Sequence, residues 1–263
     1  MLEINKIHNC DNIVGMKQLP DECIDLVVTS PPYDNLRNYN GYSFDFDNVA
    51  KQLYRVVKDG GVVVWIVSDA TINGSETGTS FRQALYFKEI GFNLHDTMIW
   101  CKDGGGAIGS NYTYTQNFEY MFIFSKGKPK SINLIYDKVS KTYDGKEYQR
   151  KESRGGNDKG DRGYTNITRL EKSRRNNWWY LVPQAQEGSK FHPAVFPEKL
   201  VADHILSWSN EGELVLDPFM GSGTTAKVAR ILGRKYIGFE ISKEYCDNAN
   251  NRLDNNKSLF DLD

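Results

Sequence analysis

The chain has no long apolar run, no paired cysteines and almost no net charge. No stretch of eighteen apolar residues occurs, so we expect no membrane span. The amino-terminal end lacks a basic segment followed by an apolar one, so we expect no export signal. The four cysteines lie far apart and form no CxxC pair, which argues against a structural zinc site or a disulfide framework. A reducing cytoplasm fits this usage.

What remains is the composition of an ordinary globular protein. Hydrophobic residues make up 39% and charged residues 25% of the 263 positions. This length predicts one α/β domain with an insertion and allows a substantial core.

The net charge of −1 conceals an uneven distribution. Residues 126–190 contain sixteen Lys and Arg against eight Asp and Glu, so this segment carries +8 and the rest of the chain about −9. Such segregation suits phosphate binding, and we expect Arg174 and Arg175 to contact DNA. The alternative is a solvated, partly disordered insertion. The aromatic residues Trp178–Tyr180 at its end fit a core better than base stacking.

The segment TSPPY, Thr29–Tyr33, follows the apolar run Ile24–Val28, which predicts a buried strand. Two prolines donate no backbone N–H and end the strand in a rigid turn. The hydroxyl of Ser30 and the ring of Tyr33 should then lie at the carboxyl end of a strand, where open α/β sheets bind ligands. Such a site can accept hydrogen bonds from an amino group and stack a flat ring. The alternative is a strand end without chemistry.

A second strand-turn-helix pattern occupies Leu214–Thr225, LVLDPFMGSGTT. Two glycines permit positive φ angles and close approach of a ligand, and the helix start offers free N–H groups. The strand Tyr236–Glu240 follows and ends in a carboxylate, as expected for binding a ribose. Gly223 is followed by Thr224 and not by Lys, so the segment fits an ATP-binding phosphate loop poorly.

Together these segments resemble amino-methylating DNA methyltransferases of the permuted group, in which the catalytic motif precedes the cofactor motif. The resemblance extends from about Ile4 to Arg252 with a variable middle, and it implies S-adenosylmethionine as cofactor and DNA as substrate. The target base must leave the duplex to be methylated. Matching positions assign the target base to Ser30, Pro31, Pro32 and Tyr33, and the cofactor to Asp11, Asp217, Pro218, Phe219, Gly221, Ser222, Gly223, Thr224, Thr225 and Glu240. His192–Leu200 resembles the segment that closes over the methionine end.

The chain has no Pro-Cys pair, which argues against methylation at cytosine carbon 5 by a cysteine nucleophile. SPPY is commoner among cytosine-N4 enzymes, and Arg37 and Tyr39 also resemble that group and are expected to contact DNA. Adenine N6 is the alternative target. RNA or protein-amide methylation and an inactive DNA-binding module fit less well. We expect no metal, a monomer or homodimer of prokaryotic or phage origin, and a cognate restriction endonuclease as a candidate partner.

The expected fold is a doubly wound, mostly parallel, seven-stranded α/β sheet of the Rossmann-like methyltransferase type. Residues 1–125 should form the catalytic half, 126–190 the target-recognition insertion and 191–263 the cofactor half. Because the cofactor half draws on both Asp11 and the segment from Asp217 to Glu240, the two chain ends should meet inside one sheet.

Overall fold

The computed structural model describes residues 2–32, 44–102, 113–140, 147–151, 164–168, 171–181 and 197–254. It divides into two compact units, residues 134–176 and the rest of the chain. The smaller unit lies inside the predicted insertion 126–190. Of the helices within these ranges, none has the length and apolar character that a bilayer span requires.

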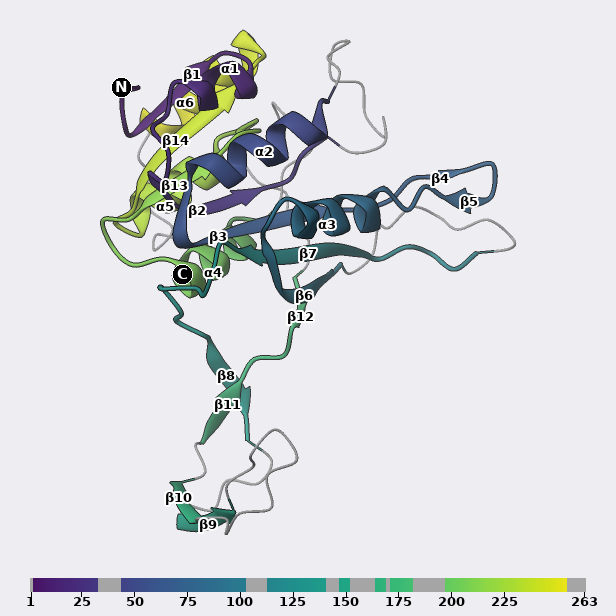
Figure 1. The fold of residues 1–263 in the computed structure, drawn as a ribbon, viewed down its shortest axis with the longest axis vertical. Helices are drawn as coiled ribbons and strands as arrows, with labels where there is room; N and C mark the ends of the chain where they lie inside the picture. The colour runs from purple at the N-terminus through teal and green to yellow at the C-terminus, as the bar shows by residue number, and fades with distance from the viewer. Residues whose placement is uncertain are drawn as a thin grey trace. The chain divides into compact units, whose positions relative to one another are not determined.

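The larger unit is built on one eight-stranded sheet with the order β1-β14-β13-β2-β3-β7-β6-β12 (Figure 1). All neighbouring strands are parallel except β7, which is antiparallel to both β3 and β6. The strands are β1 (Lys6–Asn9), β2 (Ile24–Thr29), β3 (Val57–Val67), β6 (Asn93–Cys101), β7 (Phe118–Ser125), β12 (Trp178–Tyr180), β13 (Leu214–Asp217) and β14 (Lys235–Glu240). The doubly wound fold is therefore confirmed, with one strand more than expected, because Trp178–Tyr180 pairs with the edge of β6.

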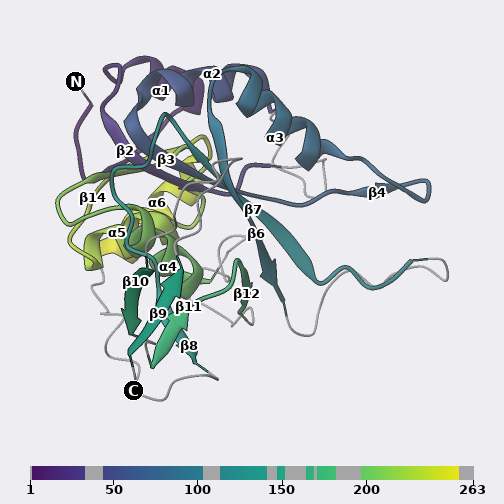
Figure 2. The ribbon, with the colours of Figure 1, turned by 60° about the horizontal axis from the view of Figure 1, so that its bottom comes forward.

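Helices cover both faces of this sheet. Figure 2 shows α1, α2 and α3 along one face and α4, α5 and α6 on the other. Their bounds are α1 (Asn12–Lys17), α2 (Phe46–Val56), α3 (Thr79–Glu89), α4 (Glu198–Trp208), α5 (Thr224–Ile231) and α6 (Lys243–Asp254). The central strands β2 and β3 are mostly buried and contain the apolar runs Leu26–Val28 and Val62–Val67, as strands covered on both faces do.

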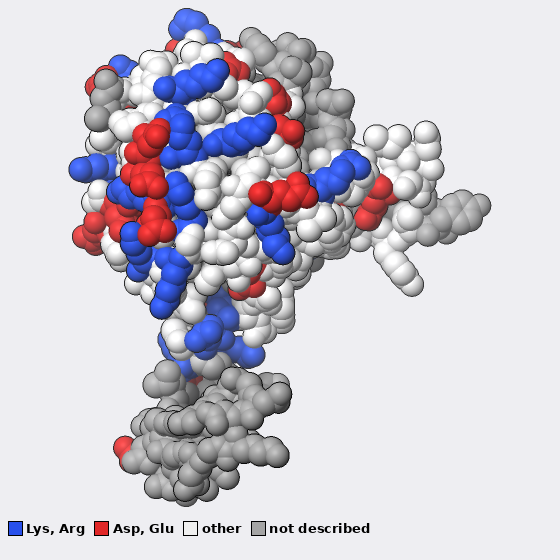
Figure 3. Space-filling view, viewed as in Figure 1, with Lys and Arg blue, Asp and Glu red and all other residues white. Residues whose placement is uncertain are grey.

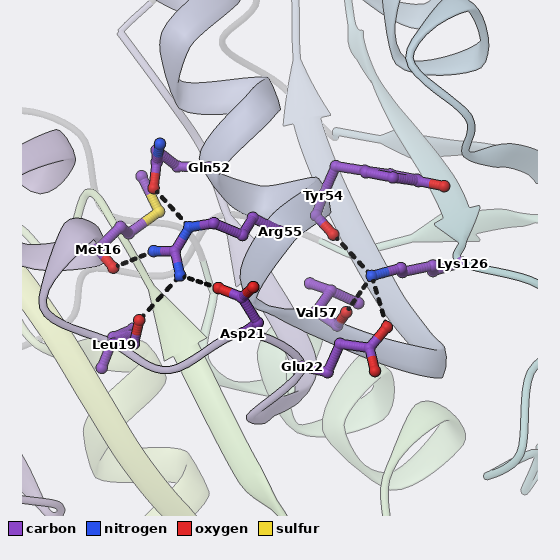
Figure 4. A network of polar contacts seen from close by, with 9 residues as sticks. All are labelled: Met16, Leu19, Asp21, Glu22, Gln52, Tyr54, Arg55, Val57 and Lys126. Carbon is purple, nitrogen blue, oxygen red and sulfur yellow. Dashed lines mark hydrogen bonds and ion pairs between the residues drawn. The ribbon is translucent and has the colours of Figure 1, made fainter. Parts of the chain in front are cut away.

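The two ends of the chain meet as expected, because β1 pairs in parallel with β14. On the α1–α3 side, Arg55 donates to two carbonyl groups at the end of α1, and Lys126 donates to two at the end of α2 (Figure 4). Cations at helix carboxyl ends offset the helix dipole. The partners are Met16, Leu19 and the Asp21 carboxylate for Arg55, and Tyr54, Val57 and the Glu22 carboxylate for Lys126. These contacts hold α1, α2 and β7 together away from the carboxyl ends of the central strands.

Besides the eight-stranded sheet, the described residues form three two-stranded sheets. The larger unit carries β4 (Thr71–Ile72) with β5 (Ser75–Glu76). The smaller unit consists of β8 (Tyr136–Val139) with β11 (Lys172–Arg174), and β9 (Glu147–Lys151) with β10 (Tyr164–Thr168). Twelve Lys and Arg against seven Asp and Glu give residues 134–176 a net charge of +5. On the face of the larger unit seen in Figure 3, described basic and acidic side chains are interspersed instead.

Candidate active site

The two predicted motifs follow neighbouring strands of the sheet. From β13 the chain crosses through α5 to β14, whereas from β2 it crosses through α2 to β3 on the opposite side. The order of the strands therefore reverses between β2 and β13, and such a switch point opens a crevice at the carboxyl ends of the strands. The described part of TSPPY, Thr29–Pro32, begins at the end of β2 at this crevice, and the turn Asp217–Thr225 begins at the end of β13 there. The sheet thus brings together segments almost 190 residues apart.

Asp217 connects the two segments directly. Its Oδ1 accepts a hydrogen bond from the Thr29 hydroxyl at 2.6 Å and from the Phe219 backbone N–H at 3.0 Å. Its Oδ2 accepts a hydrogen bond from the Thr225 hydroxyl at 2.7 Å. Because a carboxylate has about four acceptor positions, at most about one remains for a ligand. Asp217, predicted as a cofactor contact, is therefore engaged mainly with the protein itself.

The turn after Asp217 has the conformation that its glycines allow. Gly221 and Gly223 adopt φ angles of 50° and 79°, in the left-handed region that favours glycine. Gly223 is also the N-cap of α5, which has no side-chain cap. The backbone N–H groups in the first turn of α5 have no partners within the helix, and they form a site suited to a carboxylate or another anion.

Glu240 lies at the end of β14 and holds this turn from the other side. One carboxylate oxygen accepts the Gly221 N–H and the other accepts the Ser242 N–H, each at 2.8 Å. Asn9, in register with Glu240, ends β1. Asp11 follows it and accepts the Val14 N–H at 3.0 Å as the N-cap of α1. The predicted cofactor residues Asp11 and Glu240 therefore lie at the ends of adjacent strands.

The crevice holds two carboxyl groups whose affinity for protons is raised. Burial raises the pKa of Asp217 to about 6, against the opposing effect of its hydrogen bonds from Thr29, Thr225 and Phe219. Burial also raises the pKa of Glu240, and the nearby charge of Asp217 adds to the shift. A positively charged ligand would favour the ionised form of both groups. The crevice thus combines buried acids suited to a cation with helix N–H groups suited to an anion.

The remaining predicted cofactor residues form the walls of the turn. Pro218 is buried, and the ring of Phe219 packs edge-to-face against Phe44 at 5.4 Å. Ser222 and Thr224 share a hydroxyl contact at 3.2 Å, and the guanidinium of Arg252 donates to both the Ser222 carbonyl and the Thr224 hydroxyl.

The sequence analysis gave no individual role to Thr29, Glu198 or Arg252. Glu198 accepts ion pairs from both Arg252 and Lys227, so it joins the starts of α4 and α5 to the end of α6. All three side chains of this cluster are largely buried. No signal in the sequence links Glu198 to Arg252, because the pair is 54 residues apart.

Ser30 is half-buried and Pro31 is buried at the end of β2. Tyr33, Arg37 and Tyr39, together with His192–Phe196, lie outside the described residues. In the smaller unit, Arg174 lies over the ring of Tyr136 at 6.0 Å, whereas Arg175 pairs with the Asp137 carboxylate. The two arginines, expected to act together on DNA, therefore have different surroundings.

Comparison with known proteins gives one consistent result. The family model described as DNA methylase, for N6 and N4 methyltransferases, matches residues 24–251. The orphan methyltransferase M.BamHII of Bacillus amyloliquefaciens is 59% identical over 91% of this chain and 92% of its own length. The Type II methyltransferase M.BglII of Bacillus subtilis is 30% identical over 94% of this chain and 68% of its own length.

Solved structures share the fold. The cytosine-N4-specific PvuII DNA methyltransferase superposes with a TM-score of 0.69 at 23% identity, covering 96% of this chain and 87% of that one. A complex of M1.HpyAVI with S-adenosylmethionine superposes with a TM-score of 0.65 at 22% identity, covering 94% and 98%. With the family model matching most of its length, the chain belongs to the DNA methylase family of N6 and N4 amino-methyltransferases.

Proposed function

We propose that this DNA methyltransferase moves the methyl group of S-adenosylmethionine to the exocyclic N4 amino group of cytosine. The observation that carries the proposal is the crevice between β2 and β13, where the Thr29–Asp217 hydrogen bond joins the TSPPY strand end to the cofactor turn. Sequence order alone leaves these segments far apart. Their junction at the switch point provides the proximity that direct transfer between two bound reactants requires.

The residues of the crevice suit S-adenosylmethionine in charge and hydrogen-bonding capacity. The cofactor has a sulfonium and an ammonium group, which suit the buried acids Asp217 and Glu240, and a carboxylate, which suits the N–H groups at the start of α5. Glu240 keeps acceptor capacity for ribose hydroxyls, because each of its oxygens accepts only one of the Gly221 and Ser242 bonds. The bound cofactor supplies an electrophilic methyl group, so no covalent enzyme intermediate is needed.

The chain's own residues then act on the base. An exocyclic amino nitrogen is a poor nucleophile, because its lone pair is delocalised into the ring. Ser30 and the carbonyl next to Pro31 accept hydrogen bonds from the amino hydrogens and so favour a directed lone pair. Tyr33 stacks on the extruded ring, a contact worth ~1–3 kcal/mol.

Two observations favour cytosine over adenine. Ser30 stands where adenine enzymes more often have an acid, and the PvuII enzyme of the same fold is cytosine-N4-specific.

The cofactor assignment is tested at Glu240. We expect Glu240→Ala to weaken S-adenosylmethionine binding by ~1.5–3 kcal/mol, because it removes a charged acceptor. Titration calorimetry measures this change, with Glu244→Ala as the matched exposed control on α6. Equal affinities in the two folded variants would show that Glu240 does not contact the cofactor.

The product is tested with labelled cofactor and three acceptors, namely unmethylated genomic DNA, RNA and protein. We expect label in DNA alone and N4-methylcytosine as the modified nucleoside by mass spectrometry. N6-methyladenine would move the proposal to the alternative target, and label in RNA or protein would contradict it.

The relative at 59% identity is named an orphan methyltransferase, which favours a solitary enzyme over one paired with an endonuclease.

A further inference from the structure

We propose that Thr29 and Thr225 are positioning residues for methyl transfer, and that they act through Asp217 to fix the base-holding segment relative to the cofactor turn. This inference rests on the proposed function of the crevice. It assigns a role to Thr29, the first residue of the TSPPY segment, to which the sequence analysis gave none. It also changes the expected role of Thr225, which was predicted to contact the cofactor directly and is here proposed to position the site through Asp217.

We call the hydrogen bonds from Thr29 and Thr225 to the Asp217 carboxylate the bridge. The backbone pairing between β2 and β13 ends just before it. Strands β2 and β13 pair at Leu26–Val215 and at Val27–Leu216. Beyond these positions Val28 and Thr29 pair only with β3 on the other side. The Thr29–Asp217 and Thr225–Asp217 hydrogen bonds therefore continue the connection into the crevice after the ladder has stopped. The Thr225 hydroxyl also lies 3.4 Å from the Val28 carbonyl oxygen and so contacts both strands.

The three side chains are isolated from solvent. Thr29, Thr225 and Asp217 are exposed by 0%, 1% and 1% of their surface, so water cannot replace a lost partner without entering the core. Hydrogen bonds to a carboxylate are among the stronger ones in proteins, and the low dielectric of the interior strengthens them further. A bridge of this kind fixes distances better than one exposed to water would.

Each end of the bridge is adjacent to a group that the chemistry uses. Thr29 directly precedes Ser30, and Thr225 is in the first turn of α5, whose backbone N–H groups have no partners within the helix. A second contact runs parallel to the bridge, because Phe219 of the turn packs against Phe44 and Trp65 of the other half. That contact is apolar and tolerates sliding, whereas the hydroxyl–carboxylate bridge sets direction. Misplacement of reacting groups by about 1 Å can lower a rate about 100-fold.

The experiment compares Thr29→Val, which keeps the shape of the side chain but lacks the hydroxyl, with Thr29→Ser, which keeps the hydroxyl. Single-turnover methyl transfer to unmethylated genomic DNA, S-adenosylmethionine affinity and melting temperature are measured for both. We expect Thr29→Val to transfer methyl about 10- to 100-fold more slowly while cofactor affinity changes less than about threefold. Thr29→Ser should remain within about threefold of the wild type. Thr225→Val should slow transfer similarly, and the double variant should lose less than the product of the two effects.

A Thr29→Val protein with the wild-type rate would overturn the inference. So would a joint loss of rate, cofactor affinity and melting temperature that Thr29→Ser does not restore, since this would make the bridge purely structural. Multiplicative effects in the double variant would show that the two threonines do not act through one carboxylate. Failure of the proposed function is a separate outcome, because the wild-type protein would then transfer no methyl group to DNA.

Discussion

The carboxyl group of Asp217 is buried where ligand contact and structural hydrogen bonding compete for the same oxygen atoms. Three of its acceptor positions are taken by Thr29, Phe219 and Thr225. The motif includes Asp217, which lies at the end of β13. It could not reveal which oxygen faces a ligand, because that depends on a hydroxyl 188 positions away in the chain. The residue type predicts which groups Asp217 can bind, whereas only the fold shows which of its oxygen atoms are bonded within the protein.

The raised pKa of Asp217 has a consequence for stability. The folded protein binds this proton more tightly, with a pKa of about 6 against an ordinary value of 3.8. The stabilisation by this group is therefore complete below pH ~4 and is lost as the pH rises through ~6. Asp217→Asn lacks this titration. We expect the free energy of unfolding of the wild type minus that of the variant to fall by on the order of 2–3 kcal/mol between pH ~4 and ~7. Denaturant unfolding at several pH values measures this difference. A difference that stays constant with pH would contradict a raised pKa.

At the scale of elements, the strands that follow the strongest patterns were predicted at the right places. β2 begins at Ile24 and extends one residue beyond the predicted apolar run Ile24–Val28, and β13 begins at Leu214, as the second pattern does. Short elements were missed, because six residues of α1 or three of β12 carry too little periodicity to stand out. Trp179 of β12 is buried and stacks on His204 at 4.6 Å, as expected for a core residue, whereas Trp178 and Tyr180 are exposed.

The ion pairs of Glu198 with Arg252 and Lys227 connect α4, α5 and α6, and we expect them to stabilise the fold around the cofactor turn. Glu198→Gln leaves the cations of Arg252 and Lys227 without their counter-charge in a largely buried place. We expect the free energy of unfolding to fall by about 2–4 kcal/mol, because removing one partner of a buried ion pair leaves the other charge buried without compensation. Chemical denaturation of Glu198→Gln beside Glu244→Gln, the same change at an exposed position, measures it. Equal midpoints would mean that the cluster does not stabilise the fold.

At the scale of the whole molecule, the resemblance predicted that both chain ends build one half of the sheet, and the β1–β14 pairing confirms it. Residues 134–176 form a compact unit that lies within the positive segment 126–190, whose bounds as an insertion stay a prediction. Its role in reading DNA stays a prediction. The sequence could not distinguish Arg174 from Arg175, because their different partners, the Tyr136 ring and the Asp137 carboxylate, come from strand β8, more than 30 positions away in the chain.

That difference predicts unequal roles in DNA binding. Arg175 is neutralised by Asp137, whereas Arg174 contacts only an aromatic ring among the interactions described for it. We expect Arg174→Ala to reduce the slope of log affinity against log salt by about 1, as for one lost phosphate contact. Arg175→Ala removes the same charge and should change the slope less. Fluorescence anisotropy at several salt concentrations measures both slopes. An equal reduction in both variants would place both arginines on the DNA.

The central claim is that the crevice between β2 and β13 is the place of methyl transfer, and Ser30 tests it most directly. The measurement is the single-turnover rate of Ser30→Ala on unmethylated genomic DNA, taken together with its cofactor affinity and melting temperature. We expect the rate to fall at least about 10-fold while cofactor affinity and melting temperature stay near the wild type, as for a contact made chiefly in the transition state. A stable Ser30→Ala protein that transfers methyl at the wild-type rate would contradict the account.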